Sequence, residues 1–151
     1  MPEPENNKLT IRDASPEDLD AIVILLQQLW PSSEISAISV GDSFRKSYSL
    51  DGHIIRVAVY DERIVGLCSL SIRNNLKTEG NLSNIDELVV DESMRGDGIG
   101  KMLLEDAEKI SRENGCKVLG LESSFHRERA HRFYDGNGYK KQGYYITKKI
   151  G

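Results

Sequence analysis

Apolar residues recur with two different periods along the chain, and each period predicts a different kind of element. From Leu9 to Asp13 apolar and polar residues alternate, which predicts an opening strand. A helix is expected next, because Ser15 suits its N-cap and Pro16 its first position. Pro31 ends this helix, and its expected buried stripe consists of Leu19, Ile22, Val23, Leu26, Leu29 and Trp30.

The segment 32–52 is less regular. Ile35, Ile38, Phe44 and Tyr48 suggest a second helix, but Gly41 interrupts the pattern. Asp51-Gly52 then predicts a turn. After it, the β-branched runs Ile54–Tyr60 and Ile64–Ile72 flank the polar residues 61–63, which predicts a hairpin.

Strands and helices are expected to alternate beyond a loop at 74–80. The pattern predicts a central strand at about 81–90 and a helix that ends near Asn114-Gly115. A short strand at 117–123 and a helix at 128–135, closed by Gly136-Asn137-Gly138, follow. Tyr139–Ile150 is expected to hold one or two strands broken at Gly143. A meander of strands followed by a strand-helix-strand-helix unit predicts the α+β class.

Length and composition set the broad class. With 151 residues, of which 38% are hydrophobic and 29% charged, one soluble domain spanning 1–151 is expected. Residues 1–8 are polar and acidic, which predicts a flexible N-terminus and no signal peptide. No apolar run approaches the roughly 20 residues of a membrane span. Cys68 and Cys116 lack a CxxC spacing, which suits a reducing cytoplasm, and the three histidines form no metal-ligand pattern.

The net charge of −4 argues against a nucleic-acid partner, but the charge is unevenly distributed. Residues 1–50 hold eight acids against four bases, whereas bases outnumber acids from Lys117 onward. A basic second half suits a polyanionic cofactor, and an acidic first half suits a cationic acceptor. Solvated faces of mixed sign explain the acidic half equally well.

The most informative stretch runs from Ile85 to Leu104: a strand, the glycine-rich turn Arg95-Gly96-Asp97-Gly98-Ile99-Gly100, and a helix. Glycines let backbone N–H groups approach an anion, and the first turn of a helix adds unpaired N–H groups, so this order predicts a phosphate cradle. The spacing fits neither a dinucleotide fingerprint nor a Walker A loop, because Lys101 and Met102 stand where those motifs need glycine and Ser or Thr. Taken alone, the stretch also fits a turn without a ligand.

The pattern Arg-x-x-Gly-x-Gly resembles the acetyl-CoA loop of the GCN5-related N-acetyltransferase (GNAT) family. A second block, Arg129-Ala-His-Arg-Phe-Tyr-Asp-Gly-Asn-Gly-Tyr139, is similar to the family's Ala-x-x-Phe-Tyr-x-x-x-Gly-Phe/Tyr. Both blocks occur in the family's order over residues 81–150, which leaves a ligandless turn with little support. The resemblance implies a GNAT-like, mixed, mostly antiparallel twisted sheet with helices on both faces, in which the central and following strands are parallel.

The resemblance also implies the residues of the site. Backbone N–H groups of the central strand are expected to hold the thioester and pantetheine, the glycine-rich turn to hold the pyrophosphate, and Tyr134 to act as general acid toward the leaving thiolate. The family often has Asn where this chain has Arg127, so the contact made there is open. The expected cofactor-binding residues are Leu88, Val89, Val90, Arg95, Gly96, Asp97, Gly98, Ile99, Gly100, Lys101, Arg127, Ala130 and Phe133.

An amine acceptor also needs a base, because neutralising an amine of pKa ~10.4 at pH 7 costs about 4.6 kcal/mol. Glu87, beside the predicted acetyl-binding strand, is the first candidate. If it alternates with Asp86, only one of the two faces the cleft. An ordinary strand-face acid or a substrate-orienting role fits Glu87 as well. Glu122 and Glu34 are weaker candidates, and His126 and His131 are expected to be structural.

We therefore expect a cytoplasmic enzyme that moves an acetyl group from acetyl-CoA directly to a primary amine of a small molecule, such as an aminoglycoside-like compound, a polyamine or an amino sugar. Cys116 lies far along the chain from any base, so an acyl-enzyme has little support. The alternatives are acetylation of a peptide or protein amine and a non-catalytic acetyl-CoA sensor. No metal, nucleic acid or membrane is expected, and Tyr139–Ile150 could offer an edge strand to a homodimer.

Overall fold

The structure is a computed structural model and describes residues 9–151. The chain divides into two compact units, the first ending at Gly120 and the second comprising Leu121–Gly151. The flexible N-terminus expected at 1–8 lies outside the described residues. That residues 1–151 form one domain stays a prediction.

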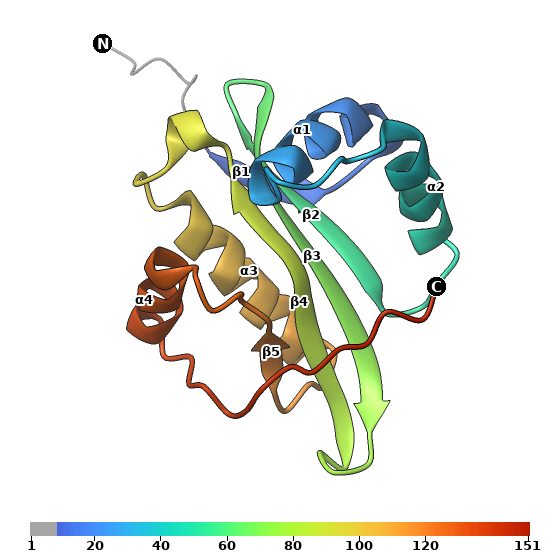
Figure 1. The fold of residues 1–151 in the computed structure, drawn as a ribbon, viewed down its shortest axis with the longest axis vertical. Coiled ribbons are helices and arrows are strands. Elements are labelled where there is room, and N and C mark those ends of the chain that lie inside the picture. The colour runs from blue at the N-terminus through green and yellow to red at the C-terminus, as the bar shows by residue number, and fades with distance from the viewer. Residues whose placement is uncertain (1–8) are drawn as a thin grey trace. The chain divides into compact units, whose positions relative to one another are not determined.

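A five-stranded sheet organises the first unit, in the order β1-β2-β3-β4-β5 (Figure 1). Each pair from β1 to β4 is antiparallel. The backbone bonds from Lys117 N to Asn81 O and from Ser83 N to Val118 O advance together along both segments, which makes β5 parallel to β4. The expected mostly antiparallel sheet is confirmed. Its strands are β1 (Thr10–Asp13), β2 (His53–Tyr60), β3 (Arg63–Asn75), β4 (Gly80–Val90) and β5 (Leu119–Leu121).

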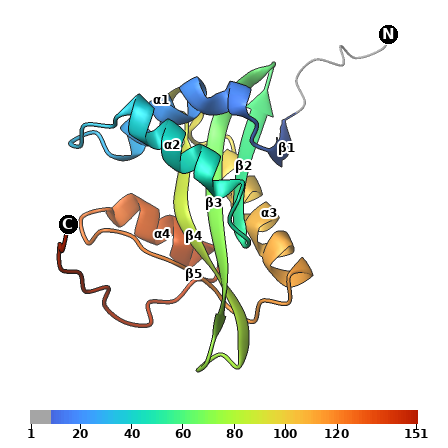
Figure 2. The ribbon, with the colours of Figure 1, turned by 90° about the vertical axis from the view of Figure 1, so that its right-hand side faces the viewer.

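Helices cover both faces of this sheet, as Figures 1 and 2 show. α1 (Leu19–Leu29) and α2 (Ala37–Ser47) lie on one face, where Leu67 belongs to the same buried cluster as residues of both helices. α3 (Ile99–Glu113) lies on the other face: a Cβ added to Gly66, the neighbour of Leu67, would meet Leu103 of α3. Side chains alternate along a strand, so these neighbours point to opposite helix layers.

The predicted first helix forms, preceded by a single 3-10 turn at Pro16–Asp18. Asp18 accepts a hydrogen bond from Ser15 N at 2.8 Å, and Arg12 contacts both of its carboxylate oxygens at 2.7 and 2.9 Å. These contacts fix the entry of the chain into α1. The buried residues of α1 are Ile22, Leu25 and Leu26. The predicted stripe therefore missed Leu25, and its member Trp30, at the C-cap, is 36% exposed.

The expected interruption at Gly41 is wrong, because α2 runs through this residue. Gly41 is buried, and a Cβ there would stand 3.2 Å from Leu19 Cδ2 and 3.4 Å from an Arg45 guanidinium nitrogen. A glycine within a helix weakens it but also permits close packing. The glycine therefore marks where α2 approaches α1 rather than where the helix stops.

The predicted hairpin of β2 and β3 is confirmed, with Asp61 and Glu62 at φ 50° and 62° in the tight turn. The loop expected at 74–80 is shorter, because Asn75 still pairs with Gly80 across β3 and β4. β4 therefore pairs with β3 from Gly80 to Val90, and a short 3-10 turn at Glu92–Met94 separates it from the glycine-rich turn.

The second unit contains α4 (Glu128–Gly136), close to the prediction. The strands expected in Tyr139–Ile150 are wrong: no residue of this segment belongs to a strand, and the strand expected at 117–123 shrinks to β5. Aromatic and β-branched residues favour strands where a neighbour pairs with them and one face is buried. Here four of the large apolar residues are 70–92% exposed, namely Tyr144, Tyr145, Ile146 and Ile150.

Candidate active site

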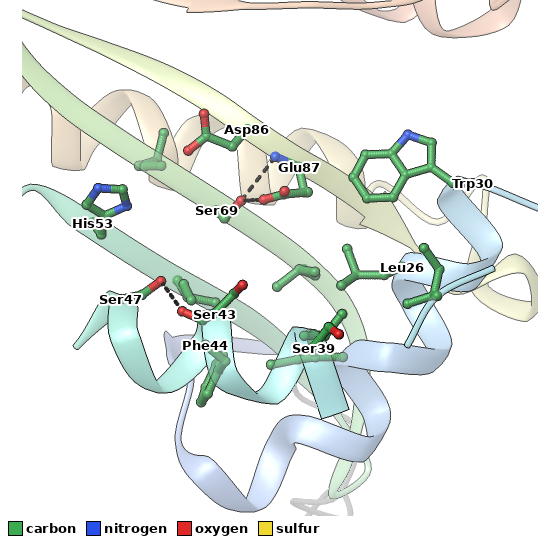
Figure 3. A pocket seen from close by; sticks show the side chains of 16 residues that line it. Leu26, Trp30, Ser39, Ser43, Phe44, Ser47, His53, Ser69, Asp86 and Glu87 are labelled. Atoms are coloured by element: carbon green, nitrogen blue, oxygen red, sulfur yellow. Dashed lines mark hydrogen bonds between the residues drawn. The ribbon is translucent and has the colours of Figure 1, made fainter. Parts of the chain in front are cut away.

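A cavity of about 450 Å³ opens in the first unit between the sheet and the helices α1 and α2 (Figure 3). Its apolar wall comes from α1, α2 and the inner strands, and its polar groups come from α2, β2, β3 and β4. The lining residues are Ile22, Leu26, Trp30, Ile35, Ser39, Val40, Ser43, Phe44, Ser47, His53, Ile55, Leu67, Ser69, Leu70, Asp86 and Glu87.

Both acids of β4 line this cavity, contrary to the simple alternation considered from the sequence. The register explains it: Ser69 pairs with Glu87 and the next residue, Leu70, pairs with Ile85, so Asp86 is the extra residue of a β-bulge. An extra residue in one strand disrupts the alternation of side chains. The bulge thus adds a second carboxylate to the site and lies just before Leu88, Val89 and Val90.

Glu87 is half-buried and held by Ser69. The hydroxyl of Ser69 accepts a hydrogen bond from Glu87 N at 3.0 Å and donates one to the Glu87 carboxylate. Burial raises the pKa of Glu87, the Ser69 hydrogen bond lowers it, and the nearby charge of Asp86 raises it, with a raised pKa as the net result. A carboxylate with a raised pKa in a cavity is suited to accept a proton near neutral pH.

Residues of the cavity opposite Glu87 were not singled out from the sequence. Ser39, Ser43 and Ser47 recur every four residues, so they share one face of α2, and His53 begins β2 (Figure 3). Ser47 Oγ donates to Ser43 O at 3.0 Å. The serine spacing was visible in the sequence, but it signals a shared face only once α2 is known to continue through Gly41.

The glycine-rich turn has the geometry of an anion cradle. Gly96 and Gly98 have φ of 91° and 80°, and a Cβ at either would meet nothing within 4 Å among the described residues. Gly98 is the N-cap of α3, and no side chain caps the helix there. The N–H groups of Ile99, Gly100 and Lys101 belong to the first turn of α3, where a helix leaves its N–H groups without intrahelical acceptors.

Hydrogen bonds hold the segment between the end of β4 and Arg95 in place. Gln28 of α1 accepts a hydrogen bond from Glu92 N at 2.9 Å and donates one to Asp91 at 3.4 Å. Arg95 Nε donates to Val90 O at 3.2 Å. The end of β4, the turn and the helix that lines the cavity are thus tied together.

The remaining predicted cofactor residues and the predicted acid belong to the second unit. Arg127 is the N-cap of α4, and Ala130, Phe133 and Tyr134 lie within this helix. The ring of Tyr134 stands 5.3 Å from that of Phe133 and 6.0 Å from that of Tyr139. Their roles in the reaction stay predictions.

The weaker candidates for the base do not line the cavity. Glu34 is exposed, and no residue of the segment 74–80 contributes to the lining either. The segment from Trp30 to Tyr48 contributes seven lining residues. Across residues 9–151, no helix is both long and apolar enough to cross a membrane.

Comparison with known proteins identifies the family. Residues 20–139 match the family model of the acetyltransferase (GNAT) family. The chain is 33% identical to the aminoalkylphosphonate N-acetyltransferase of Salmonella typhimurium, over 93% of this chain and 90% of that one. It is also 33% identical to the glucosamine 6-phosphate N-acetyltransferase of Trypanosoma brucei brucei, over 87% and 89%. A solved transcriptional regulator from Bacillus halodurans has 25% identity and a TM-score of 0.88, over 95% of this chain and 100% of that one. The chain belongs to the GNAT family and is an N-acetyltransferase.

Proposed function

We propose that the protein transfers an acetyl group from acetyl-CoA directly to a primary amine of a small molecule held in the cavity. The observation that carries this is the placement of Glu87: a half-buried carboxylate with a raised pKa, fixed by Ser69, stands in a cavity and directly precedes the acetyl-binding stretch of the family. The two relatives are named for small amines, which supports an acceptor of similar size.

The first step is deprotonation of the acceptor. Glu87, directly or through a water molecule, accepts a proton from the ammonium group and leaves a neutral nitrogen. That nitrogen attacks the thioester carbonyl, forming a C–N bond as the C–S bond breaks. Backbone N–H groups of Leu88–Val90 stabilise the charge that develops on the carbonyl oxygen. The thiolate leaves as CoA, and Tyr134 donates a hydrogen bond or a proton to it. The newly bonded nitrogen still carries one proton too many and releases it to solvent, or to the Tyr134 phenolate if that residue has given up its own proton.

The turn before α3 fits the pyrophosphate of the donor. Positive φ at Gly96 and Gly98, the open space beside them and the uncapped helix end together suit a bulky anion. Arg95 and Lys101 add positive charge at the two ends of the turn. The family resemblance also assigns donor contacts to Arg127, Ala130 and Phe133, and we keep these assignments as part of the proposal.

We also place the reaction in the cytoplasm. Cys68 and Cys116 are free thiols, and a reducing compartment keeps thiols in that state.

A second candidate function is an acetyl-CoA sensor, favoured by the structural likeness to a protein described as a transcriptional regulator. A sensor needs the donor cradle but not a base in a separate cavity. Glu87 therefore supports the enzyme over the sensor.

The testing experiment measures CoA release from acetyl-CoA with a panel of aminoglycosides, polyamines, amino sugars, amino acids and basic peptides. Wild type is compared with Tyr134→Phe, which removes only the hydroxyl. We expect one class of small amine to be acetylated and the variant to be slower, because the leaving thiolate loses its hydrogen-bond donor. Tight acetyl-CoA binding with no release for any amine would instead support the sensor.

A further inference from the structure

The acceptor cavity is lined by two carboxylates and by neither lysine nor arginine, and His53 is the other titratable side chain among its described lining residues. The two carboxylates are those of Asp86 and Glu87. An acceptor that fills the cavity displaces water from these carboxylates, so an acceptor that brings positive charge is favoured over a neutral or anionic one.

The two carboxylates are not equivalent. Glu87 is half-buried and bonded to Ser69, as suits a group that accepts a proton. Asp86 is exposed to the cavity and receives hydrogen bonds from Ser71 Oγ at 3.1 Å and Asn84 Nδ2 at 3.0 Å. Both donors are neutral, so they orient the carboxylate without neutralising it.

One oxygen of Asp86 remains for a ligand. Both hydrogen bonds end on Oδ1, and across residues 9–151 no protein group bonds Oδ2 or forms an ion pair with Asp86. The β-bulge that makes Asp86 the extra residue brings this oxygen to the same cavity as Glu87. The site thus offers a base and, beside it, a fixed anion.

We propose that Asp86 binds a second ammonium group of the acceptor, so that the preferred substrate is an amine with two positive charges and no phosphate. This inference rests on the proposed function, since it concerns the acceptor of the same reaction. Glu87 accepts the proton from the reacting nitrogen, while Asp86 binds the second ammonium group. A phosphate in this cavity would face two carboxylates with no lysine or arginine among the lining residues.

The test uses matched amines and isosteric variants. Putrescine, a diamine, is compared with aminobutanol, in which a hydroxyl replaces one amino group. Asp86→Asn removes the charge and keeps the shape. Asp61→Asn, in the β2–β3 turn outside the lining, removes an equal charge at a position where asparagine accepts the observed φ of 50°. Assays run at mildly alkaline pH, because the charge of Asp86 also contributes to the raised pKa of Glu87.

We expect wild type to have a KM for putrescine about tenfold below that for aminobutanol, equivalent to about 1.4 kcal/mol. Asp86→Asn should abolish this difference and Asp61→Asn should retain it. Glucosamine should also be acetylated better than its phosphate ester. A KM ratio that Asp86→Asn leaves unchanged, or a preference for the phosphate ester, would overturn the inference while leaving the acetyltransferase function intact.

If no amine were acetylated, the proposed function would fail and calorimetry would decide the inference separately. Putrescine is titrated into the protein in the presence of CoA. An affinity that Asp86→Asn lowers about tenfold and Asp61→Asn preserves supports the second ammonium site. Equal affinity in all three proteins contradicts it.

Discussion

Replacing Glu87 by Gln tests the assignment of the base. The change keeps the length of the side chain and its partner Ser69, whose hydroxyl bonds both the backbone and the side chain of residue 87. Neutralising an amine of pKa ~10.4 at pH 7 costs about 4.6 kcal/mol, and a positioned base typically contributes about 10²–10⁴ in rate. Because Glu87 is only half-buried and solvent can partly replace it, we expect the lower end, a kcat reduced about 100-fold. This is about 2.7 kcal/mol at 1.36 kcal/mol per tenfold.

The pH profile of kcat tests the role of Glu87 as base more directly than the size of the rate loss does. With its pKa raised by burial, Glu87 is ionised and active above that pKa, so the wild-type rate should fall as pH decreases through it. Glu87→Gln should remove this acid limb. Ser69→Ala should keep the limb but move it to higher pH, because the Ser69 hydrogen bond lowers the pKa of Glu87.

CoA release is measured at saturating acetyl-CoA and acceptor, with CoA binding as the control for folding. An unchanged kcat and an unchanged acid limb in Glu87→Gln would refute the role of Glu87. A limb that moves to lower pH in Ser69→Ala would refute the role of Ser69.

Three further predictions concern the framework of the site. Gly98→Ala places a Cβ at φ 80° but in open space, so we expect about 1–2 kcal/mol of backbone strain in thermal unfolding and weaker CoA binding by calorimetry; unchanged affinity would contradict the cradle. Gly66→Ala brings a Cβ to 2.9 Å from Leu103 Cδ1, so urea unfolding should show about 1–3 kcal/mol of destabilisation, and no loss would refute the close packing of α3. Burial raises the pKa of Cys68 to about 12, so a thiol reagent should modify only Cys116 in the native protein and both cysteines in urea; rapid modification of both in the native state would contradict the burial.

Most strands and helices could be predicted from the sequence because residues at their ends carry local signals. Ser15 and Pro16 mark the beginning of the first helix, and Gly115, at φ 69°, follows the end of α3. The prediction that Gly41 interrupts the second helix was wrong. The weak helix propensity of glycine is visible in the sequence, whereas the close approach of Gly41 in α2 to Leu19 in α1 is not.

The acceptor side of the site was less predictable for a similar reason. A period of two describes a regular strand, and the extra residue Asp86 is defined only by its pairing with β3. Ser69 likewise joins the site through cross-strand pairing with Glu87. The segment Tyr139–Ile150 has the composition of strands, but a strand also requires a paired neighbour, which local sequence does not specify.

Direct acetyl transfer to an amine is tested by mass spectrometry of a single incubation with acetyl-CoA and the best acceptor. We expect an acceptor that carries one acetyl group on nitrogen, formed in proportion to released CoA, and a protein whose mass is unchanged. A protein that gains an acetyl group on Cys116 and then passes it on would contradict direct transfer. CoA release without an acetylated acceptor would contradict the acetyltransferase reaction proposed for this cavity.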